Sequence, residues 1–278
     1  MSNRLQALYG LKWNLFVPSV PTEALHVAPR VDSFCRRVCQ LASDGGFALV
    51  SGAPGVGKSA SLRILVDHLA QQRDVTVGMI SRPQANIGDF YREMGDLFGV
   101  ELQPHNRWAG TKVLRQRWQA HIDGSLNRPV LVIDEAQELK PVVLSELRLL
   151  ASARLDSYIL LTIVLAGDTR LVDRLRSDEF LPLDSRMRVR LTLERAAPEA
   201  LQSCLHHALS QAGAPALMTP EVIHTLADHA QGNLRALMIM ADDLLTAAAE
   251  RNARQIDEAL FFELYAPPTE ARTARRRR

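Results

Sequence analysis

A glycine-rich segment between an apolar run and a helix-like segment constrains this chain more than any other stretch. The apolar run Phe47–Val50 predicts a buried strand, and the apolar residues after Ser59 recur at the spacing of one helix face. Between them, Gly52 to Ser59 reads Gly-x-x-x-x-Gly-Lys-Ser. Glycines in such a turn let backbone N–H groups face an anion, and the helix N-terminus adds positive potential. The segment therefore predicts a phosphate-binding P-loop.

The P-loop pattern predicts a role for its individual residues. Lys58 is expected to reach the β- and γ-phosphates of a nucleoside triphosphate, and the Ser59 hydroxyl is expected to ligate Mg²⁺. An accidental glycine-rich turn is the alternative, and the strand and helix on either side disfavour it. We therefore expect ATP and Mg²⁺ as cofactors, with ATP contacts from Gly52, Pro54, Gly55, Val56, Gly57, Lys58, Ser59 and Ala60.

A second apolar run ends in two adjacent carboxylates. Val130–Ile133 predicts a strand, and Asp134 and Glu135 follow it directly. Ligands of open α/β sheets bind at the C-terminal ends of the strands. Asp134 is therefore expected to hold Mg²⁺ through water, and Glu135 is expected to polarise the attacking water. An exposed acidic pair that caps the next helix is the alternative, and the P-loop on the same predicted sheet disfavours it.

Apolar runs and helix-like segments alternate along the chain as far as Pro198. Because the runs are apolar throughout, they fit a parallel sheet that is covered by helices on both faces. Beyond Pro198 the pattern is purely helical. The predicted fold class is α/β, with a small all-helical lid after the sheet. The strands are expected near 47–50, 75–80, 130–133, 159–165 and 189–193, and the lid helices near 198–212, 220–230, 233–250 and 255–264.

These patterns divide the chain into four parts. Residues 1–29 contain a compact group of aromatic residues, and we expect an extended arm packed on the nucleotide-binding core because disordered tails are poor in aromatics. The α/β nucleotide-binding domain is expected at 30–194 and the helical lid at 195–265. The basic tail, residues 266–278, is expected to be disordered.

The composition of the chain excludes several classes of protein. The net charge of +2 gives no global field that attracts nucleic acid or membrane, so any such surface must be local. Cys35, Cys39 and Cys204 form no Cys-x-x-Cys pair and fit a reduced cytosolic protein. No signal peptide is evident, and the longest apolar run, Tyr158–Ala166, is too short to span a bilayer. We therefore expect a cytoplasmic protein.

Five segments together resemble a known family: Tyr9–Phe16, Gly52–Ser59, Val130–Gln137, Leu165–Gly167 and Gly232–Arg235. The chain resembles the AAA+ ATPases and, within them, the ExeA-like ATPases. That group includes the TniB and TnsC ATPases of DNA transposition, with MuB and IstB more distant. The P-loop and the acidic pair are common to P-loop NTPases, whereas Tyr-Gly-Leu and Asp-Glu-Ala-Gln are more specific to this group. The family usually carries proline at the position of Leu15.

The resemblance implies three further site residues. Arg186 resembles the arginine finger that reaches the ATP of a neighbouring subunit. Arg188 and Arg190 compete for that role, although Arg190 alternates within the last predicted strand and fits a structural role. Arg235 resembles the second sensor residue of the lid, with a solvated helix arginine as the alternative. Asp168 stands where such ATPases carry a first sensor, usually an amide or hydroxyl, and a turn or helix cap is the alternative role.

Residues 105–128 carry a local excess of positive charge. Basic residues stand there against a single acid, and Trp108 and Trp118 are interleaved with them. The segment either neutralises DNA phosphates or is an ordinary solvated helix face. In the transposition ATPases the equivalent region contacts the duplex backbone. The resemblance therefore implies DNA binding by Arg107, Lys112, Arg115 and Arg117.

The resemblance and the basic segment together imply an ATP-dependent, DNA-binding ATPase that oligomerises on duplex DNA and regulates or targets a transposase. The expected partners are double-stranded DNA, a DDE-type transposase with a targeting factor, and further copies of this chain in a ring or helical filament. An ExeA-like ATPase of secretion or envelope assembly and a helicase-loader-type ATPase are the alternatives. ExeA-like proteins usually carry a transmembrane helix and a cell-wall-binding domain after the ATPase; neither is evident up to Arg278, so we expect the transposition role.

Overall fold

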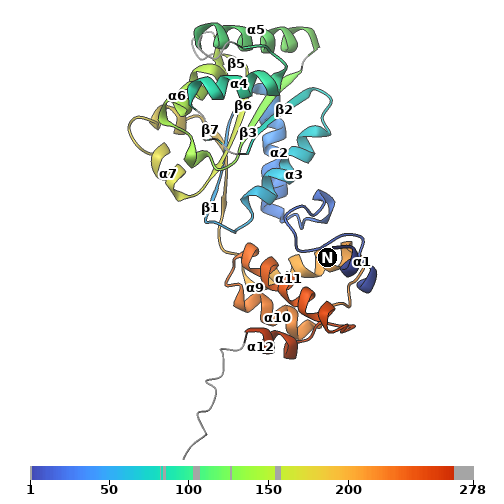
Figure 1. Ribbon diagram of the computed structural model, residues 1–278. Coiled ribbons are helices and arrows are strands. Elements are labelled where there is room, and N and C mark those ends of the chain that lie inside the picture. The colour runs from blue at the N-terminus through green and yellow to red at the C-terminus, as the bar shows by residue number, and fades with distance from the viewer. Residues whose placement is uncertain are drawn as a thin grey trace, which may run out of the picture. The chain divides into compact units, whose positions relative to one another are not determined.

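The computed structural model describes residues 2–81, 83, 86–102, 107–125, 127–153 and 158–265, without the side chains of residues 2–4, 107 and 125. The chain divides into two compact units. Residues 27–194 form one unit, and residues 1–26 join residues 195 onward in the other. Figure 1 follows the chain through both units.

Within the described residues, five parallel strands form the central sheet of the 27–194 unit, in the order β2-β3-β6-β1-β7. Every residue of β1 and β6 is buried, because these inner strands have neighbours on both sides and helices on both faces. The edge strand β7 instead alternates between buried and exposed residues. The parallel sheet expected from the sequence is confirmed, with strands β1 (Gly46–Gly52), β2 (Val75–Ile80), β3 (Arg128–Ile133), β6 (Thr162–Gly167) and β7 (Met187–Leu193).

Helices cover both faces of this sheet (Figure 1). Side chains alternate along each strand, so Leu131 and Ile133 join the core on one face while Val130 and Val132 face the other. Helices α2 (Pro29–Asp44) and α3 (Lys58–Ala70) cover one face. The opposite face is covered by α4 (Ile87–Phe98), α5 (Arg107–Ser125), α6 (Pro141–Ala151) and α7 (Thr169–Leu175), with the short α8 (Leu181–Asp184) behind α7.

The single strand predicted over residues 159–165 is wrong in its first residues, because a short antiparallel pair precedes β6. Strand β5 (Tyr158–Ile159) pairs with β4 (Ser152–Ala153), and the strand of the main sheet begins only at Thr162. Leu160 and Leu161, between the two, are buried in the core. Continuous apolar sequence therefore marks burial here, and it does not distinguish a buried connection from a strand.

The second unit is helical and has its own apolar core. Pro198 and Pro220 stand in the first turns of their helices, where a missing N–H costs no hydrogen bond. No helix in the described part of the chain is long and apolar enough to cross a membrane. The helices of the predicted lid are α9 (Pro198–Gln211), α10 (Pro220–His229), α11 (Leu234–Glu250) and α12 (Glu258–Tyr265).

The N-terminal arm differs from the prediction. It contains helix α1 (Ser2–Tyr9) and the single turn η1 (Thr22–Ala24), and it is not extended throughout. Its apolar residues are buried in the same core as the helices α9 to α12, so the arm belongs to the helical unit. A helix of two turns is too short to show a clear period in sequence. The buried residues of the arm are Leu5, Leu11, Leu15 and Phe16.

The boundary at 194/195 coincides with the division between the units, whereas the first boundary lies at 26/27 instead of 29/30. The predicted disordered tail, residues 266–278, lies outside the described residues. All three cysteines are free thiols. Burial raises the pKa of Cys35 to about 12 and that of Cys204 to about 11, so these thiols are held in the unreactive protonated form.

Candidate nucleotide-binding site

Strand β6 lies between β1 and β3, and the carboxyl ends of these three strands bring separate motifs together. The P-loop follows β1, the acidic pair follows β3, and Asp168 follows β6. Ser51 pairs with Gly167 and Ile133 with Leu165, so the three strands end at nearly the same level. Ligands of open parallel sheets bind at this edge.

The backbone of the P-loop depends on its glycines. Gly55 and Gly57 have φ angles of +82° and +101°, which residues with a side chain rarely adopt. Gly52 is required for space, because a Cβ there would lie 2.5 Å from the carbonyl oxygen of Leu193. Gly57 stands directly before α3, whose first N–H groups have no partner within the helix. The loop and the helix N-terminus together offer N–H groups to an anion.

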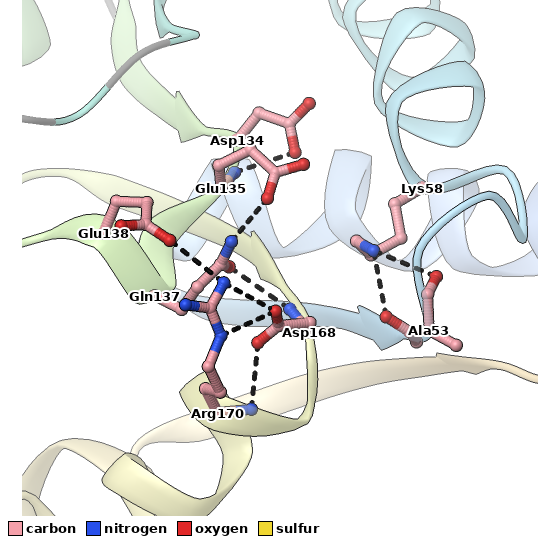
Figure 2. A network of polar contacts seen from close by, with 9 residues as sticks. Ala53, Lys58, Asp134, Glu135, Gln137, Glu138, Asp168 and Arg170 are labelled. Carbon is pink, nitrogen blue, oxygen red and sulfur yellow. Dashed lines mark hydrogen bonds and ion pairs between the residues drawn. The ribbon is translucent and has the colours of Figure 1, made fainter.

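The side chain of Lys58 is buried, with 6% exposure, and its ammonium lies against the loop. Its Nζ donates hydrogen bonds of 2.9 Å to the carbonyl of Gly52 and 3.1 Å to that of Ala53 (Figure 2). A buried ammonium needs such partners. They hold one positive charge at the place where the P-loop pattern predicts the phosphates.

The hydroxyl of Ser59 donates a 2.8 Å hydrogen bond to Oδ2 of Asp134. A hydroxyl and a carboxylate are the hard oxygen ligands that Mg²⁺ prefers, so this pair fits the ion. Among the described residues, no group of three or more His, Cys, Asp or Glu side chains could hold a metal by itself. Mg²⁺ usually takes one or two protein ligands and completes its coordination shell with phosphate oxygens and water. Ser59 and Asp134 fit this number of protein ligands.

Glu135 has a left-handed backbone, with φ of 50° and ψ of 39°. Such a conformation costs a non-glycine residue about 1 kcal/mol or more, and in proteins it is concentrated at functional sites. Its N–H donates a 2.9 Å hydrogen bond to Oδ1 of Asp134, so the Asp134 carboxylate supports the backbone of this turn. The Glu135 side chain is half-buried at the C-terminal end of β3, where the sequence predicts a water-activating carboxylate.

Gln137 lies between Glu135 and Asp168 and contacts both (Figure 2). It belongs to the short turn η2 (Ala136–Glu138) and is 4% exposed. Its Nε2 donates to Oε2 of Glu135, and its Oε1 accepts a 3.2 Å hydrogen bond from the N–H of Asp168. Gln137 was not among the predicted site residues, although the Asp-Glu-Ala-Gln motif contains it.

Asp168 caps helix α7, which is one of its two predicted alternatives. Its Oδ1 accepts the N–H of Arg170 at 2.9 Å, and its Oδ2 accepts the Arg170 guanidinium at 2.8 and 2.9 Å. Arg170 also reaches Glu138 at 3.0 Å. Partial burial opposes ionisation of Asp168, but the hydrogen bonds from Arg170 and the charges of Arg170 and Lys58 outweigh it and hold the pKa of Asp168 below its usual value.

The three candidates for the arginine finger lie around the start of β7. Arg186 is half-buried in the turn before the strand and donates a 2.8 Å hydrogen bond to the carbonyl of Pro182. Arg188 is exposed on the strand. Arg190 pairs with the carboxylate of Asp184 at 2.9 Å, in the structural role that its place in the strand indicated.

Arg235 lies in the first turn of α11, in the helical unit, and is exposed. The side chain of Asn233 caps this helix by accepting the N–H of Ala236. Gly232, just before the cap, has φ of +77°, and a Cβ there would lie 2.6 Å from Cβ of Arg195. The Gly-Asn-Leu-Arg segment is therefore a helix start whose glycine is required by the backbone.

Helix α5 carries the four predicted DNA-binding residues, and the structure separates them. Lys112 and Arg117 are exposed. Arg115 is half-buried, and its guanidinium donates to the carbonyl of Ser152. The side chain of Arg107, the first residue of the helix, lies outside the described residues.

The two tryptophans of α5 also differ. Trp108 is 74% exposed, and Nζ of Lys112 lies 5.3 Å from the centre of its ring. Trp118 is 1% exposed and packs edge-on against Phe98, with the ring centres 5.3 Å apart. Trp118 is therefore part of the core, whereas Trp108 is exposed beside Lys112.

Comparison with known proteins agrees with this geometry. Residues 40–175 match the family model of the AAA domain. The chain is 30% identical over 220 residues, 78% of its length, to General secretion pathway protein A of Aeromonas hydrophila, and it spans 39% of that longer protein.

Two solved structures share the fold. Cdc6p from Pyrobaculum aerophilum superposes with a TM-score of 0.69 at 17% identity, over 87% of this chain and 67% of that one. The Aeropyrum pernix ORC1 protein in complex with DNA gives a TM-score of 0.68 at 16% identity, over 90% of this chain and 67% of that one. Residues 40–175 therefore match an AAA domain, and the chain shares the α/β P-loop fold of these two structures.

Proposed function

We propose that this chain is a Mg²⁺-dependent ATPase that binds duplex DNA, assembles with further copies of itself when ATP is bound, and regulates a transposase. The observation that carries the first part is the meeting of Lys58, the Ser59–Asp134 pair and Glu135 at one edge of the sheet. These are the groups that ATP hydrolysis requires, and they follow β1 and β3 at the C-terminal edge of the sheet.

The residues of the site perform hydrolysis in separate roles. The P-loop N–H groups and Lys58 bind and orient the β- and γ-phosphates. Ser59 and Asp134 would hold Mg²⁺, which would neutralise charge on the phosphate oxygens. Glu135 accepts a proton from a water whose oxygen forms a bond to the γ-phosphorus, while the bond from that phosphorus to the bridging oxygen breaks and its electron pair goes to the β-phosphate. ADP and inorganic phosphate are released.

Assembly is proposed from the sequence resemblance, in which Arg186 stands at the position of an arginine finger. An arginine supplied by a neighbouring subunit would stabilise the charge of the transition state, and Arg186 is our candidate. The test mixes two inactive variants, Arg186→Ala and Lys58→Ala. Activity that reappears on mixing supports a shared site, since one subunit supplies an intact P-loop and the other the arginine; no recovery at any ratio contradicts it. Arg235 of the helical unit is proposed to contact the phosphates as a second sensor.

Binding to duplex DNA is proposed from helix α5. Lys112 and Arg117 are exposed cations, and Trp108 gives Lys112 an aromatic neighbour. Cations of this kind neutralise backbone phosphates without reading sequence. The similarity in fold to an ORC1 protein solved in complex with DNA supports the same proposal. The transposase as partner rests on the sequence resemblance to the TniB and TnsC group, and a cytoplasmic location follows from a partner that works on DNA.

One experiment tests the proposal as a whole. Binding of a labelled duplex and the mass of the protein by light scattering are measured with ATP and Mg²⁺, with ADP, and without nucleotide. We expect large complexes and salt-sensitive duplex binding with ATP, together with a change in the ATPase rate when the duplex is added. A duplex that neither binds nor changes the rate contradicts the DNA and transposition parts and leaves the ATPase assignment standing.

A second candidate function is a secretion or envelope-assembly ATPase. The identity of 30% over 220 residues to General secretion pathway protein A favours it. This candidate predicts ATP hydrolysis that duplex DNA does not affect. A helicase-loader-type ATPase predicts instead that ATP-dependent complexes form with a replicative helicase in a pull-down and not with a transposase.

A further inference from the structure

The amide of Gln137 has one orientation that satisfies both of its contacts. The N–H of Asp168 is a donor, so it requires the amide oxygen of Gln137. The ionised carboxylate of Glu135 is an acceptor, so it requires the amide nitrogen. Because Gln137 is 4% exposed, water does not compete freely for either contact.

The chain makes room for this amide at Gly167. A Cβ at Gly167 would lie 2.6 Å from Oε1 of Gln137, which real Cβ atoms do not tolerate. The turn that holds Gln137 is anchored a second time, since Arg170 joins Glu138 to Asp168. The carboxyl ends of β3 and β6 are thus joined by one buried amide and one ion-pair group (Figure 2).

We propose that Gln137 is a positioning residue for ATP hydrolysis, which sets the orientation of the Glu135 carboxylate and is itself held by the backbone of Asp168. The inference rests on the proposed ATPase activity and does not depend on DNA, assembly or a transposase. Glu135 reaches the site on a left-handed backbone and a flexible side chain, so its carboxylate needs a fixed partner to meet the water at one place. The start of α7 thereby controls the residue that activates the water.

The test compares Gln137→Met with the wild type in steady-state ATPase assays. Methionine has nearly the same length and volume and makes neither hydrogen bond. We expect kcat to fall about 10- to 100-fold while KM and the dissociation constant of a fluorescent ATP analogue change by less than about threefold. Gln137→Asn keeps an amide, but its shorter side chain cannot reach both partners at once. Its kcat should therefore lie between that of the wild type and that of Gln137→Met. This milder variant also covers the case in which the methionine variant fails to fold.

A double-mutant cycle separates positioning from general damage. In single-turnover assays, Gln137→Met should lower the rate of the wild type but change the Glu135→Gln protein by less than about threefold, because its effect acts through the Glu135 carboxylate. Thr162→Val is the control for a buried change on β6, since the Thr162 hydroxyl has no hydrogen-bond partner among the described residues. Its kcat should equal that of the wild type.

Three results would overturn the inference. The first is a kcat of Gln137→Met within about twofold of the wild type. The second is an equal loss of rate in the wild-type and Glu135→Gln backgrounds, which indicates damage unrelated to Glu135. The third is a fall in ATP affinity as large as the fall in kcat. A wild-type protein that hydrolyses ATP but ignores DNA overturns the DNA proposal and leaves this test intact, whereas a wild type without hydrolysis overturns both the ATPase assignment and this inference.

Discussion

The hydroxyl of Ser59 and the carboxylate of Asp134 lie 2.8 Å apart, although 75 residues separate them in the chain. One belongs to the first turn of α3, after β1, and the other follows β3. The parallel sheet makes this contact by ending both strands at the same edge. A divalent ion bound by this pair would join two parts of the chain, the P-loop and the acidic pair.

Removing the hydroxyl should weaken the response to Mg²⁺. We expect Ser59→Ala to raise the Mg²⁺ concentration for half-maximal ATPase activity about tenfold or more, because the variant lacks one oxygen ligand. Ser59→Thr keeps the hydroxyl and should respond like the wild type. A Mg²⁺ titration of the ATPase rate measures both variants. An alanine variant with the Mg²⁺ response of the wild type would show that Ser59 does not ligate the ion.

Lys58→Ala should abolish ATP binding. The variant removes the positive charge at the loop and both hydrogen bonds to the loop carbonyls, so the phosphates lose their point charge and the loop loses its internal support. Titration with a fluorescent ATP analogue measures the affinity. Lys140→Ala is the matched control, since Lys140 is exposed before α6 and should not affect binding. Retained affinity in Lys58→Ala would contradict the site.

Glu135→Gln should bind ATP and hydrolyse it slowly. Glutamine keeps the size of the side chain but cannot accept a proton from water, so the rate should fall about 100-fold or more. Complexes that need bound ATP should then accumulate, and light scattering with ATP would detect them. The control is Glu199→Gln, the same change on an exposed carboxylate in the first turn of α9, in the helical unit. If both variants hydrolyse ATP equally fast, Glu135 is not the base.

The sequence was sufficient for the parts of the site that depend on neighbours along the chain. The P-loop and Asp134 with Glu135 each combine an apolar strand with residues directly after it, so a local pattern predicts them. The link through Gln137 joins residues 31 apart, and no local pattern reports it. The prediction assigned the N-terminal arm to the nucleotide-binding core for the same reason: the residues it packs against lie far away in the chain, after residue 195.

Helix α5 shows a different limit of sequence reasoning. Its basic residues and tryptophans have no strong helical stripe, so the pattern could not show that Trp118 faces the core and that Arg115 is held by Ser152. The two faces of α5 have similar residues in the sequence, and only the burial of each side chain distinguishes the inner face from the outer one. The structure thereby reduces the described candidates for DNA contact to Lys112 and Arg117.

The charge reversal Lys112→Glu with Arg117→Glu should weaken duplex binding. The slope of log affinity against log salt concentration is negative, and its magnitude should fall by about one for each cation that no longer neutralises a phosphate. The affinity of the protein for ATP in the absence of DNA should not change. Fluorescence anisotropy at several salt concentrations measures the slope. Arg36→Glu is the control, since Arg36 pairs with Asp32 on α2, away from α5. Duplex affinity and slope equal to those of the wild type would remove α5 from the interface.

Asp168→Asn should lower stability at neutral pH and not at low pH. Asparagine can still cap α7, but it loses the ion pair with Arg170. Because the folded-state pKa of Asp168 is lowered, the stabilisation is present above the unfolded-state pKa of about 4 and is lost as the pH falls through the folded value. Arg170 is 63% exposed, so solvent screening keeps the effect at pH 7 small.

Thermal melting followed by circular dichroism at pH 7, 5 and 3 measures this difference. We expect the variant to melt below the wild type at pH 7 and the gap to narrow toward pH 3, because the stabilisation by the ionised carboxylate is lost as the pH falls below the unfolded-state pKa of about 4. Asp173→Asn, on the same helix and exposed, is the control and should melt with the wild type at each pH. A gap that stays constant down to pH 3 would mean that the charge of Asp168 does not stabilise the start of α7, and that its cap alone does.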